Sequence, residues 1–304
     1  MNPLPDLSVA IVSADTQLVL ACLRSIRETT HEITFSVYVA INSPADADRM
    51  EEAIHSQFPE IQIVRNLEEL GFSRSNNRIL QECRARYVLL LNDDTIVHEC
   101  ALQRMVKYMD EHGEVGALGC KILNPDGTLQ WSCGKSAIHK WEYFRSGVLR
   151  TLLSPLVRDQ FFHSVVEVSW LTGACLMVRS EALKAAGLLD ERFYMYYEDG
   201  DWCFRIIQAG WKIVYFPDAE IVHLRNQTNL KRPALSVSSY YRSRLYFFSK
   251  HFSASTCLLV RVLTVCDAMV GFLKSSIRMT GRRNPELLQA YVGAMKLALT
   301  YRAE

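Results

Sequence analysis

The chain has 304 residues, 49% of them hydrophobic, and its charged side chains nearly balance to a formal net charge of +1. A chain of this size can bury a large core in one or two domains. Its charge balance excludes a dedicated nucleic-acid-binding protein, because tracking a phosphate backbone requires a basic face. Nine scattered cysteines without a C-x-x-C pair indicate a reduced, cytoplasmic protein, and the N-terminus shows no secretion signal.

The first third of the chain alternates between strand-like and helix-like segments. Compact apolar runs predict strands, and helical spacing or polar composition predicts helices between them. The run Tyr87–Leu91 is apolar throughout, as expected for a central parallel strand buried on both faces. Repeated strand–helix units predict an α/β fold with a mostly parallel central sheet flanked by helices. The strands are expected at residues 7–12, 33–41, 61–64 and 87–91, and the helices at 18–26, 46–57 and from about 73.

Polar residues follow these strands at the point where each one ends. In parallel sheets, ligands bind beyond the carboxyl ends of the strands. Taken one at a time, each residue is explained as a strand stop, but together they predict a crevice. Just beyond it, Gly71 precedes a predicted helix whose first turns carry Arg74 and Asn77, an arrangement suited to an anion such as a diphosphate. The strand-end residues are Ser13, Asn42, Asn66 and Asn92.

Two acidic sequences stand out. Asn92-Asp93-Asp94 offers hard oxygen ligands for Mg²⁺ or Mn²⁺ bridging a diphosphate, or else caps a helix predicted to begin near Glu99. Glu198, Asp199 and Asp201 place three carboxylates at the entrance of a short amphipathic helix that ends near Gly210. Capping also explains these residues taken alone, but like charges packed this closely are typical of a cation site or a proton-transfer site. Two such sequences suggest one cleft.

The order of these motifs resembles inverting family-2 glycosyltransferases, most of all the rhamnosyltransferase-like members that build bacterial surface polysaccharides. The similarity extends from about residue 7 to residue 223, or roughly three quarters of the chain. No single motif is specific, but their combination in this order is. The motifs are Leu90-Leu91-Asn92-Asp93-Asp94-Thr95, Trp170–Val178, Gly187–Asp201, Gly210-Trp211-Lys212 and His223.

The resemblance implies a nucleotide-diphospho-sugar transferase fold of the A type (GT-A) with a C-terminal helical extension. The catalytic domain would comprise residues 1–230, with a donor half at about 1–120 and an acceptor half at about 121–230. The extension would comprise residues 231–304. The donor would be a nucleotide-diphospho-sugar of the dTDP or UDP type. The acceptor would be a hydroxyl of a glycan or of a lipid-linked oligosaccharide.

By position, the resemblance assigns Asp94 as the main metal-binding carboxylate, with Asn92 in the first acidic slot and His223 completing the site. Asp199 matches the catalytic base, which would take the proton from the acceptor hydroxyl while the metal stabilises the departing diphosphate. Glu198 would orient the acceptor. The residues expected to contact substrate are Ser13, Asp15, Asn42, Asn66, Gly71, Arg74, Asn77, Asp93, Trp170, Thr172, Gly173, Ala174 and Asp201.

Departures from the family pattern concern the nucleoside. Relatives carry an acidic residue after the second strand, where this chain has Ile41, and an apolar side chain cannot accept a hydrogen bond from a base or a ribose. Asp15 is the residue expected to replace part of that contact. A second hypothesis follows from Ile41 and Asn92: a non-catalytic nucleotide-sugar-binding homologue that acts as a scaffold in a polysaccharide assembly complex. The presence of both Asp94 and Asp199 favours the enzyme.

Two further regions are less specific. Residues 135–168 are aromatic and basic, and predict either a lid or acceptor loop or an ordinary packed insertion. Near the C-terminus, an apolar run at 256–272 is interrupted by Arg261 and Asp267, and is too short and too charged for a membrane span. It predicts an amphipathic helix that either contacts the inner face of the cell membrane or packs in a helical subdomain or homodimer. Residues 285–301 predict one more helix.

Overall fold

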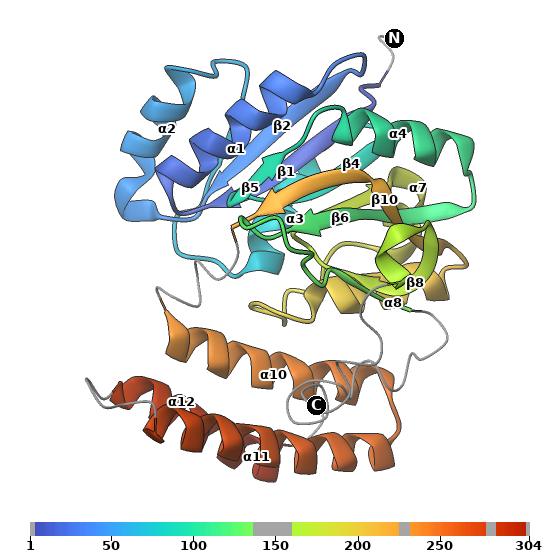
Figure 1. The fold of residues 1–304 in the computed structure, drawn as a ribbon. Coiled ribbons are helices and arrows are strands. Elements are labelled where there is room, and N and C mark those ends of the chain that lie inside the picture. Colours follow the sequence, from blue (N-terminus) through green and yellow to red (C-terminus); the bar gives the residue numbers. More distant parts are fainter. Residues whose placement is uncertain (1–3, 136–159, 225–231, 278–283, 302–304) are drawn as a thin grey trace. The chain divides into compact units, whose positions relative to one another are not determined.

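The computed structural model describes residues 4–135, 160–224, 232–277 and 284–301, and the chain divides into two compact units. The first comprises residues 1–139, 157–191 and 199–225, and the second residues 140–156, 192–198 and 226–304. The predicted lid or insertion lies largely outside the described residues. Figure 1 shows the arrangement of the elements within each unit.

The first unit is an α/β structure. Its strands are β1 (Leu7–Ser13), β2 (Phe35–Ile41), β3 (Gln62–Arg65), β4 (Tyr87–Asn92), β5 (Thr95–Val97), β6 (Val115–Leu123), β7 (Cys133–Lys135), β8 (Val166–Leu171), β9 (Cys175–Arg179) and β10 (Lys212–His223). Its α-helices are α1 (Thr16–Thr29), α2 (Ala47–His55), α3 (Phe72–Glu82), α4 (Ala101–Glu111), α7 (Ser180–Ala186) and α8 (Glu198–Gln208), and its 3₁₀ helices are η1 (Pro44–Asp46) and η4 (Gln160–His163).

These strands form one mixed sheet in the order β3-β2-β1-β4-β9-β6-β10-β8-β7, with β5 paired to β10. The strands β3, β2, β1 and β4 are parallel neighbours, and β10 is parallel to β6. The strand β9 is antiparallel to both β4 and β6 and joins the two parallel groups. The α/β class and the position of β4 inside the sheet agree with the prediction.

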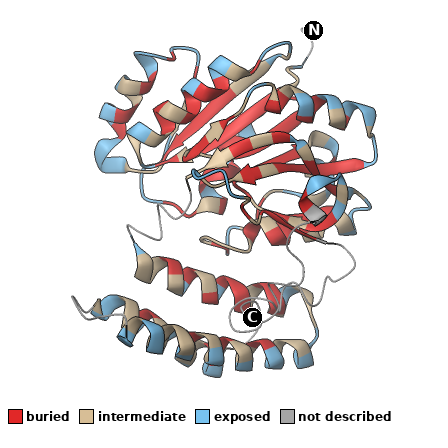
Figure 2. Cartoon of the chain, in the orientation of Figure 1, coloured by how far each residue is buried: buried red, intermediate tan, exposed pale blue. Residues whose placement is uncertain are grey.

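Each face of the sheet carries its own hydrophobic core. Leu89 and Leu91 of β4 point into the core formed with α1, α2 and α4, whereas Val88 and Leu90 point into the core formed with α3, α7 and α8. This alternation follows from the two-residue period of a strand. Burial of each such leucine contributes about 2 kcal/mol. Figure 2 shows the buried strands between exposed outer helix faces.

Some boundaries differ from the predictions. β2 begins at Phe35, two residues later than predicted, and its last five residues are buried on both faces rather than alternately. α4 begins at Ala101, after β5, and Cys100 precedes it, so Asp93 and Asp94 do not cap this helix. That alternative explanation of the Asn92-Asp93-Asp94 sequence is therefore wrong. α8 begins at Glu198, so the three carboxylates lie within its first turn rather than before it.

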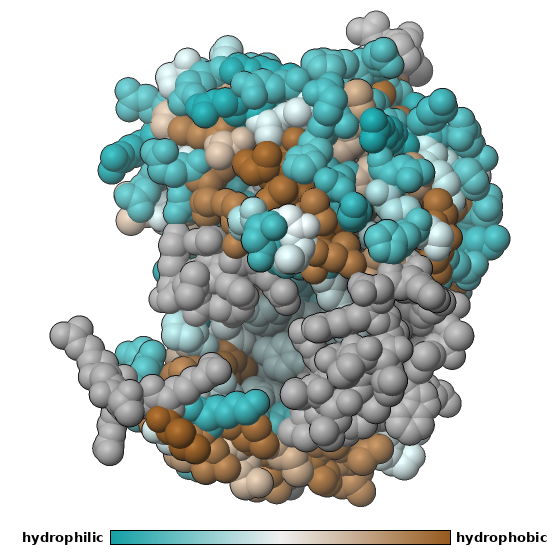
Figure 3. Space-filling model, viewed as in Figure 1, coloured by the Kyte–Doolittle hydropathy of each residue, from teal (hydrophilic) through white to brown (hydrophobic). Residues whose placement is uncertain are grey.

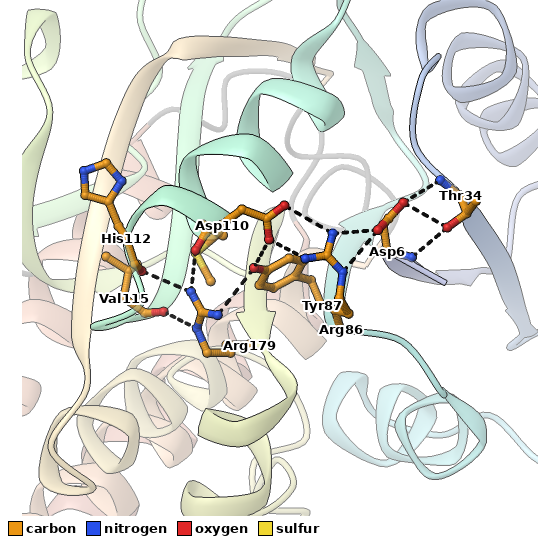
Figure 4. A network of polar contacts seen from close by, with 9 residues as sticks. Asp6, Thr34, Arg86, Tyr87, Asp110, His112, Val115 and Arg179 are labelled. Carbon is orange, nitrogen blue, oxygen red and sulfur yellow. Dashed lines mark hydrogen bonds and ion pairs between the residues drawn. The ribbon is translucent and has the colours of Figure 1, made fainter. Parts of the chain in front are cut away.

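A polar network stabilises the edge of the sheet where β1 and β4 begin (Figure 4). Arg86 contacts Asp6 at 2.6 Å and also pairs with Asp110 of α4. The hydroxyl of Tyr87 donates to Asp110 at 2.6 Å. Arg179, the last residue of β9, donates to the carbonyl groups of Val115, His112 and Met109. This network ties α4, β4 and β9 together at the edge opposite to the carboxyl ends of the parallel strands.

The second unit contains three helices, α10 (Pro233–His251), α11 (Ala254–Ile277) and α12 (Pro285–Thr300). α11 and α12 pack through small side chains, so that Ala268 and Ala294 belong to one buried cluster. A buried ion pair at 2.6 Å joins Arg244 of α10 to Asp267 of α11. At 24 residues, α11 is longer than the apolar run in the sequence, and by length and composition alone it could cross a membrane.

Candidate active site

The carboxyl ends of the parallel strands bring the predicted strand-end residues to one edge. The N–H of Asn42 donates to the Ser13 carbonyl at 2.7 Å, and the N–H of Asn66 donates to the Ile41 carbonyl at 3.1 Å. The Asn66 amide donates to Asn42 Oδ1 at 3.0 Å. Asn42 Oδ1 also accepts the N–H of Leu70 at 2.8 Å, so the two asparagines fix the loop that leads to α3. Ile41 is fully buried and cannot contact a nucleoside.

The loop after β1 contains Ser13 and Asp15. Asp15 Oδ1 accepts the N–H groups of Gln17 and Leu18 at 3.0 and 3.2 Å, so this carboxylate is the N-cap of α1. Ser13 Oγ donates to Asp93 Oδ2 at 2.6 Å and links the end of β1 to the turn after β4. Asp93 is thereby held beside the end of β1, whereas at least one oxygen of Asp15 is engaged in the helix cap.

The residues around the start of α3 divide into two groups. Arg74 is about half exposed and faces Glu68 and Glu191 at 3.8 and 3.7 Å, a loose arrangement that leaves its guanidinium accessible to an anion. Asn77 is buried, and its amide exchanges hydrogen bonds with the backbone of Leu189. Asn77 therefore joins α3 to the segment before Glu191, and its amide is engaged in the interior. Gly71 precedes the helix with ordinary extended backbone angles.

Asp94 and His223 lie together, although 129 positions separate them along the chain. Asp94 Oδ1 is 3.0 Å from His223 Nε2, and both side chains are nearly buried. Asn92 Nδ2 lies 3.3 Å from the same nitrogen. On the other side of the ring, Gln130 Oε1 is 2.6 Å from Nδ1. Because a carboxamide oxygen only accepts, Nδ1 carries a proton, and Nε2 on the other side of the ring faces Asp94 and Asn92.

This geometry fits a divalent cation. An octahedral Mg²⁺ or Mn²⁺ holds ligands at about 2.1 Å, so neighbouring ligand atoms lie about 3 Å apart, as Asp94 Oδ1 and His223 Nε2 do. Within the described part of the chain, no group of three or more His, Cys, Asp or Glu side chains is placed to hold a metal. Diphosphate oxygens and water would supply the other ligands, which is the usual arrangement for Mg²⁺ bound with a phosphorylated substrate.

Asp199 is held by backbone groups on two sides. The N–H of Gly173 donates to Oδ2 at 3.0 Å and the N–H of Gly200 donates to Oδ1 at 2.7 Å. Burial raises the pKa of Asp199, and these two N–H groups only partly oppose that effect. A carboxylate with a raised pKa is a better proton acceptor than an ordinary aspartate. The main physical cause of the raised pKa is removal of the Asp199 carboxylate from water.

The turn between β8 and β9 connects the segment of Asn92 and Asp94 to Asp199. The N–H of Asn92 donates to the Ala174 carbonyl at 3.1 Å, while the N–H of the preceding residue, Gly173, binds Asp199. A Cβ at Gly173 would lie 3.2 Å from the Phe72 ring, a tight contact. The turn is anchored by the N–H of Thr172, which donates to the Ser132 carbonyl at 2.9 Å.

Three further predicted residues have clear structural settings. Trp170 is half-buried in β8 and lies opposite Gly134 of β7. Asp201 is fully buried and accepts from Arg205 Nε at 2.8 Å, so it forms an ion pair within α8. Glu198 is also buried, at the first position of α8. Asp201 therefore has a structural partner, and Asp199 is the least buried residue of the three.

Sequence reasoning missed two features near these carboxylates. Gln130 is buried and orients His223, but it lies in an irregular segment and no pattern singles it out. Tyr196 and Tyr197, immediately before Glu198, have φ angles of 70° and 67°, which non-glycine residues rarely adopt. Within the second unit, both rings contact Tyr240 of α10, with centroids 5.9 and 5.7 Å apart.

A family model described as glycosyltransferase-like family 2 matches residues 5–245, about four fifths of the chain. The chain belongs to this family. This glycosyltransferase is 26% identical over 239 residues to the N-acetylglucosaminyl-diphospho-decaprenol L-rhamnosyltransferase of Mycobacterium tuberculosis, an alignment that covers 72% of this chain and 76% of that relative. It is also 27% identical over 180 residues to a dTDP-rhamnosyl transferase of Shigella flexneri, with 58% of this chain and 56% of that relative covered.

The fold of this glycosyltransferase also matches solved structures. GalNAc-T7 with UDP, GalNAc and Mn²⁺ superposes with a TM-score of 0.60 at 13% sequence identity, covering 100% of this chain and 57% of that one. At that identity the likeness concerns the fold, which is of the GT-A type. The predicted fold, the resemblance to family 2 and the similarity to rhamnosyltransferases are thereby confirmed.

Proposed function

We propose that this glycosyltransferase is a metal-dependent, inverting hexosyltransferase of cell-surface polysaccharide synthesis. Its donor is a dTDP- or UDP-type sugar, with rhamnose the first candidate because two relatives are named for rhamnosyl transfer. Its acceptor is a hydroxyl of a glycan or of a lipid-linked oligosaccharide, as in the name of the mycobacterial relative. The main support for this proposal is the β8–β9 turn. The N–H of Gly173 donates to Asp199, and the carbonyl of the next residue, Ala174, accepts the N–H of Asn92.

In this proposal the residues divide the reaction between them. Asp199 accepts the proton of the acceptor hydroxyl as that oxygen attacks the anomeric carbon, which inverts its configuration in a single displacement. Asp94 and His223 would hold Mg²⁺ or Mn²⁺ with Asn92 beside them, and the ion would neutralise charge on the departing diphosphate. Arg74, at the exposed start of α3, would contact the donor diphosphate.

Calorimetric titration tests the donor site first. We expect UDP or dTDP to bind the wild type more tightly with Mn²⁺ or Mg²⁺ than without, and GDP to bind more weakly. Asp94→Ala should lose the metal-dependent part of the affinity, because it removes one of the two protein ligands in the pair. Asp218→Asn is the matched control, since this exposed aspartate lies on the same strand as His223. Equal binding by wild type and Asp94→Ala would contradict the metal assignment.

An activity assay then tests the reaction. Purified protein is incubated with dTDP-rhamnose or with UDP-linked hexoses and a water-soluble analogue of a polyprenyl-linked N-acetylglucosamine, and the product is identified by mass spectrometry and NMR. A new glycosidic bond of inverted anomeric configuration supports the proposal. Retention of configuration would contradict the role of Asp199 as a single base. Metal-dependent nucleotide binding without transfer to any acceptor would favour the scaffold hypothesis.

A further inference from the structure

α11 in the second unit exposes a continuous apolar stripe. Exposed side chains recur along it at helical spacing, and at 100° per residue they fall within one arc of about 100°. No charged residue of α11 lies in that arc. Figure 3 shows hydrophobic surface over this part of the unit. The exposed residues are Leu258, Leu259, Val262, Cys266, Met269, Leu273 and Ile277.

The opposite face of α11 is committed to the protein. Val260, Thr264 and Ala268 are fully buried on that side. Arg261 Nε donates to the Ala298 carbonyl of α12 at 2.7 Å, and Asp267 is paired with the buried Arg244 of α10. A helix that crosses a bilayer on its own needs lipid-compatible side chains all round, which these contacts do not allow. Only 17% of the most apolar window is buried, so α11 is not an ordinary core helix either.

The charge of this region is opposite to that of the rest of the chain. Residues 231–304 contain twelve Lys or Arg and three Asp or Glu, a net charge of +9, so residues 1–230 carry −8. Within the three helices, Lys274 of α11 and Lys296 of α12 are exposed. A basic unit with an exposed apolar stripe complements the surface of an anionic bilayer, where each basic side chain adds to the attraction.

A groove beside the stripe strengthens this match. It has a volume of about 410 Å³ and lies between α11 and α12. Phe272, Leu288 and Val292 supply apolar walls, and Lys296 lines the same groove. Apolar walls with a nearby ammonium group suit a lipid, whose acyl chain and phosphate need these two environments at a short distance.

We propose that the α11 stripe is a monotopic membrane-binding surface that docks on anionic phospholipid, with the helix lying in the interface rather than crossing it. The occupant is the lipid bilayer itself. This inference does not depend on the identity of the donor or acceptor of the proposed function. Docking would hold the enzyme at the surface where a lipid-linked acceptor is found.

Vesicle sedimentation with the full chain tests this surface. We expect the wild type to bind vesicles of equal parts phosphatidylcholine and phosphatidylglycerol at least about tenfold more strongly than pure phosphatidylcholine, and to be partly released by salt. Leu258→Glu/Leu273→Glu should reduce binding to the mixed vesicles at least about tenfold, because both side chains lie in the stripe. The matched control is Leu4→Glu/Leu67→Glu, two leucines that are 59% and 92% exposed in the first unit. It should bind like the wild type.

Several outcomes would overturn the inference. If the wild type does not sediment with the mixed vesicles, the protein has no such membrane-binding surface. If the stripe variant binds as strongly as the control variant, the membrane-binding surface is not on α11. Protein that stays with vesicles after alkaline carbonate and high salt is a membrane span. If the wild type is a dimer, the stripe variant is a monomer and neither binds vesicles, then a second copy of the chain covers the stripe. Nucleotide titration of the same variants, expected to be unchanged, separates failure here from failure of the proposed function.

Discussion

The two edges of the central sheet use aspartate in opposite ways. At the edge where β1 and β4 begin, Asp6 and Asp110 both pair with Arg86 (Figure 4). At the edge where the parallel strands end, Asp94 faces a histidine and Asp199 is held by backbone N–H groups. The first arrangement satisfies each carboxylate with a fixed cation. The second places one carboxylate beside a metal-binding side chain and the other among backbone donors.

The pKa shifts follow this division. Burial raises the pKa of Asp6 and of Asp110, but hydrogen bonds and charge from Arg86, together with those from Thr34 to Asp6 and from Tyr87 to Asp110, outweigh it, and both pKa values are lowered. Burial also raises the pKa of Asp199. The backbone N–H groups that bind its carboxylate do not outweigh this effect, so its pKa stays raised. A paired carboxylate stabilises the fold, whereas a carboxylate with a raised pKa is suited to chemistry.

The largest expected effect is that of Asp199→Asn. An amide cannot take the acceptor proton, so we expect kcat to fall about a thousandfold while donor affinity changes less than about twofold. In the wild type, kcat should fall with decreasing pH through a pKa above that of an ordinary aspartate, because protonated Asp199 is inactive. Steady-state assays against pH measure both effects. Asp218→Asn should keep wild-type rates, and a fully active Asp199→Asn would remove this residue from the mechanism.

At the opposite edge, Arg179→Met should affect stability and not chemistry. Arg179 donates to three backbone carbonyls, and the methionine removes these three hydrogen bonds, so we expect a loss of about 3 kcal/mol in the free energy of unfolding. Urea denaturation measures it. Arg49→Met is the control, because Arg49 is exposed on α2. A large loss of kcat in Arg179→Met at a temperature where it is folded would contradict the division between the edges.

Gln130→Met should weaken the candidate cation site without touching its ligands. Gln130 is a positioning residue that orients His223, and loss of such a partner typically reduces metal affinity about tenfold. We expect the Mn²⁺ concentration for half-maximal activity to rise by that factor while kcat at saturating Mn²⁺ is largely kept. Gln130→Glu, which still accepts from His223 Nδ1, should restore much of the affinity. A uniform loss at every Mn²⁺ concentration would indicate a structural defect instead.

The smallest effect is the acid dependence of stability at the paired edge. Because the pKa values of Asp6 and Asp110 are lowered by folding, their stabilisation is present above the ordinary aspartate pKa and is lost as pH falls through the folded values. Both carboxylates are partly solvent-exposed, so we expect Arg86→Met to cost only about 1 kcal/mol at neutral pH. Its melting temperature should approach that of the wild type in acid. A difference in melting temperature between the wild type and Arg86→Met that stays constant down to pH about 3 would contradict this linkage.

Local patterns predicted most of the elements. Apolar and alternating runs located β1, β2, β3 and β4 to within two residues. β4 was the clearest, because a strand buried on both faces must be apolar throughout. Ser13, Asn42, Asn66 and Asn92 were predicted to share one edge because each follows the carboxyl end of a parallel strand. The three carboxylates were predicted at the entrance of α8 but lie within its first turn, since Glu198, Asp199 and Asp201 resemble capping residues before a helix as much as residues within its first turn.

By itself, the sequence determined the fold class and the family and singled out the carboxylates proposed for the site, because periodicity, strand ends and motif order are properties of the chain. Only the tertiary structure decided which side chains meet. The contact of Asp94 with His223, the support of His223 by Gln130 and the burial that raises the pKa of Asp199 all join segments distant in sequence. Distances and desolvation depend on packing between elements, and no local pattern encodes them.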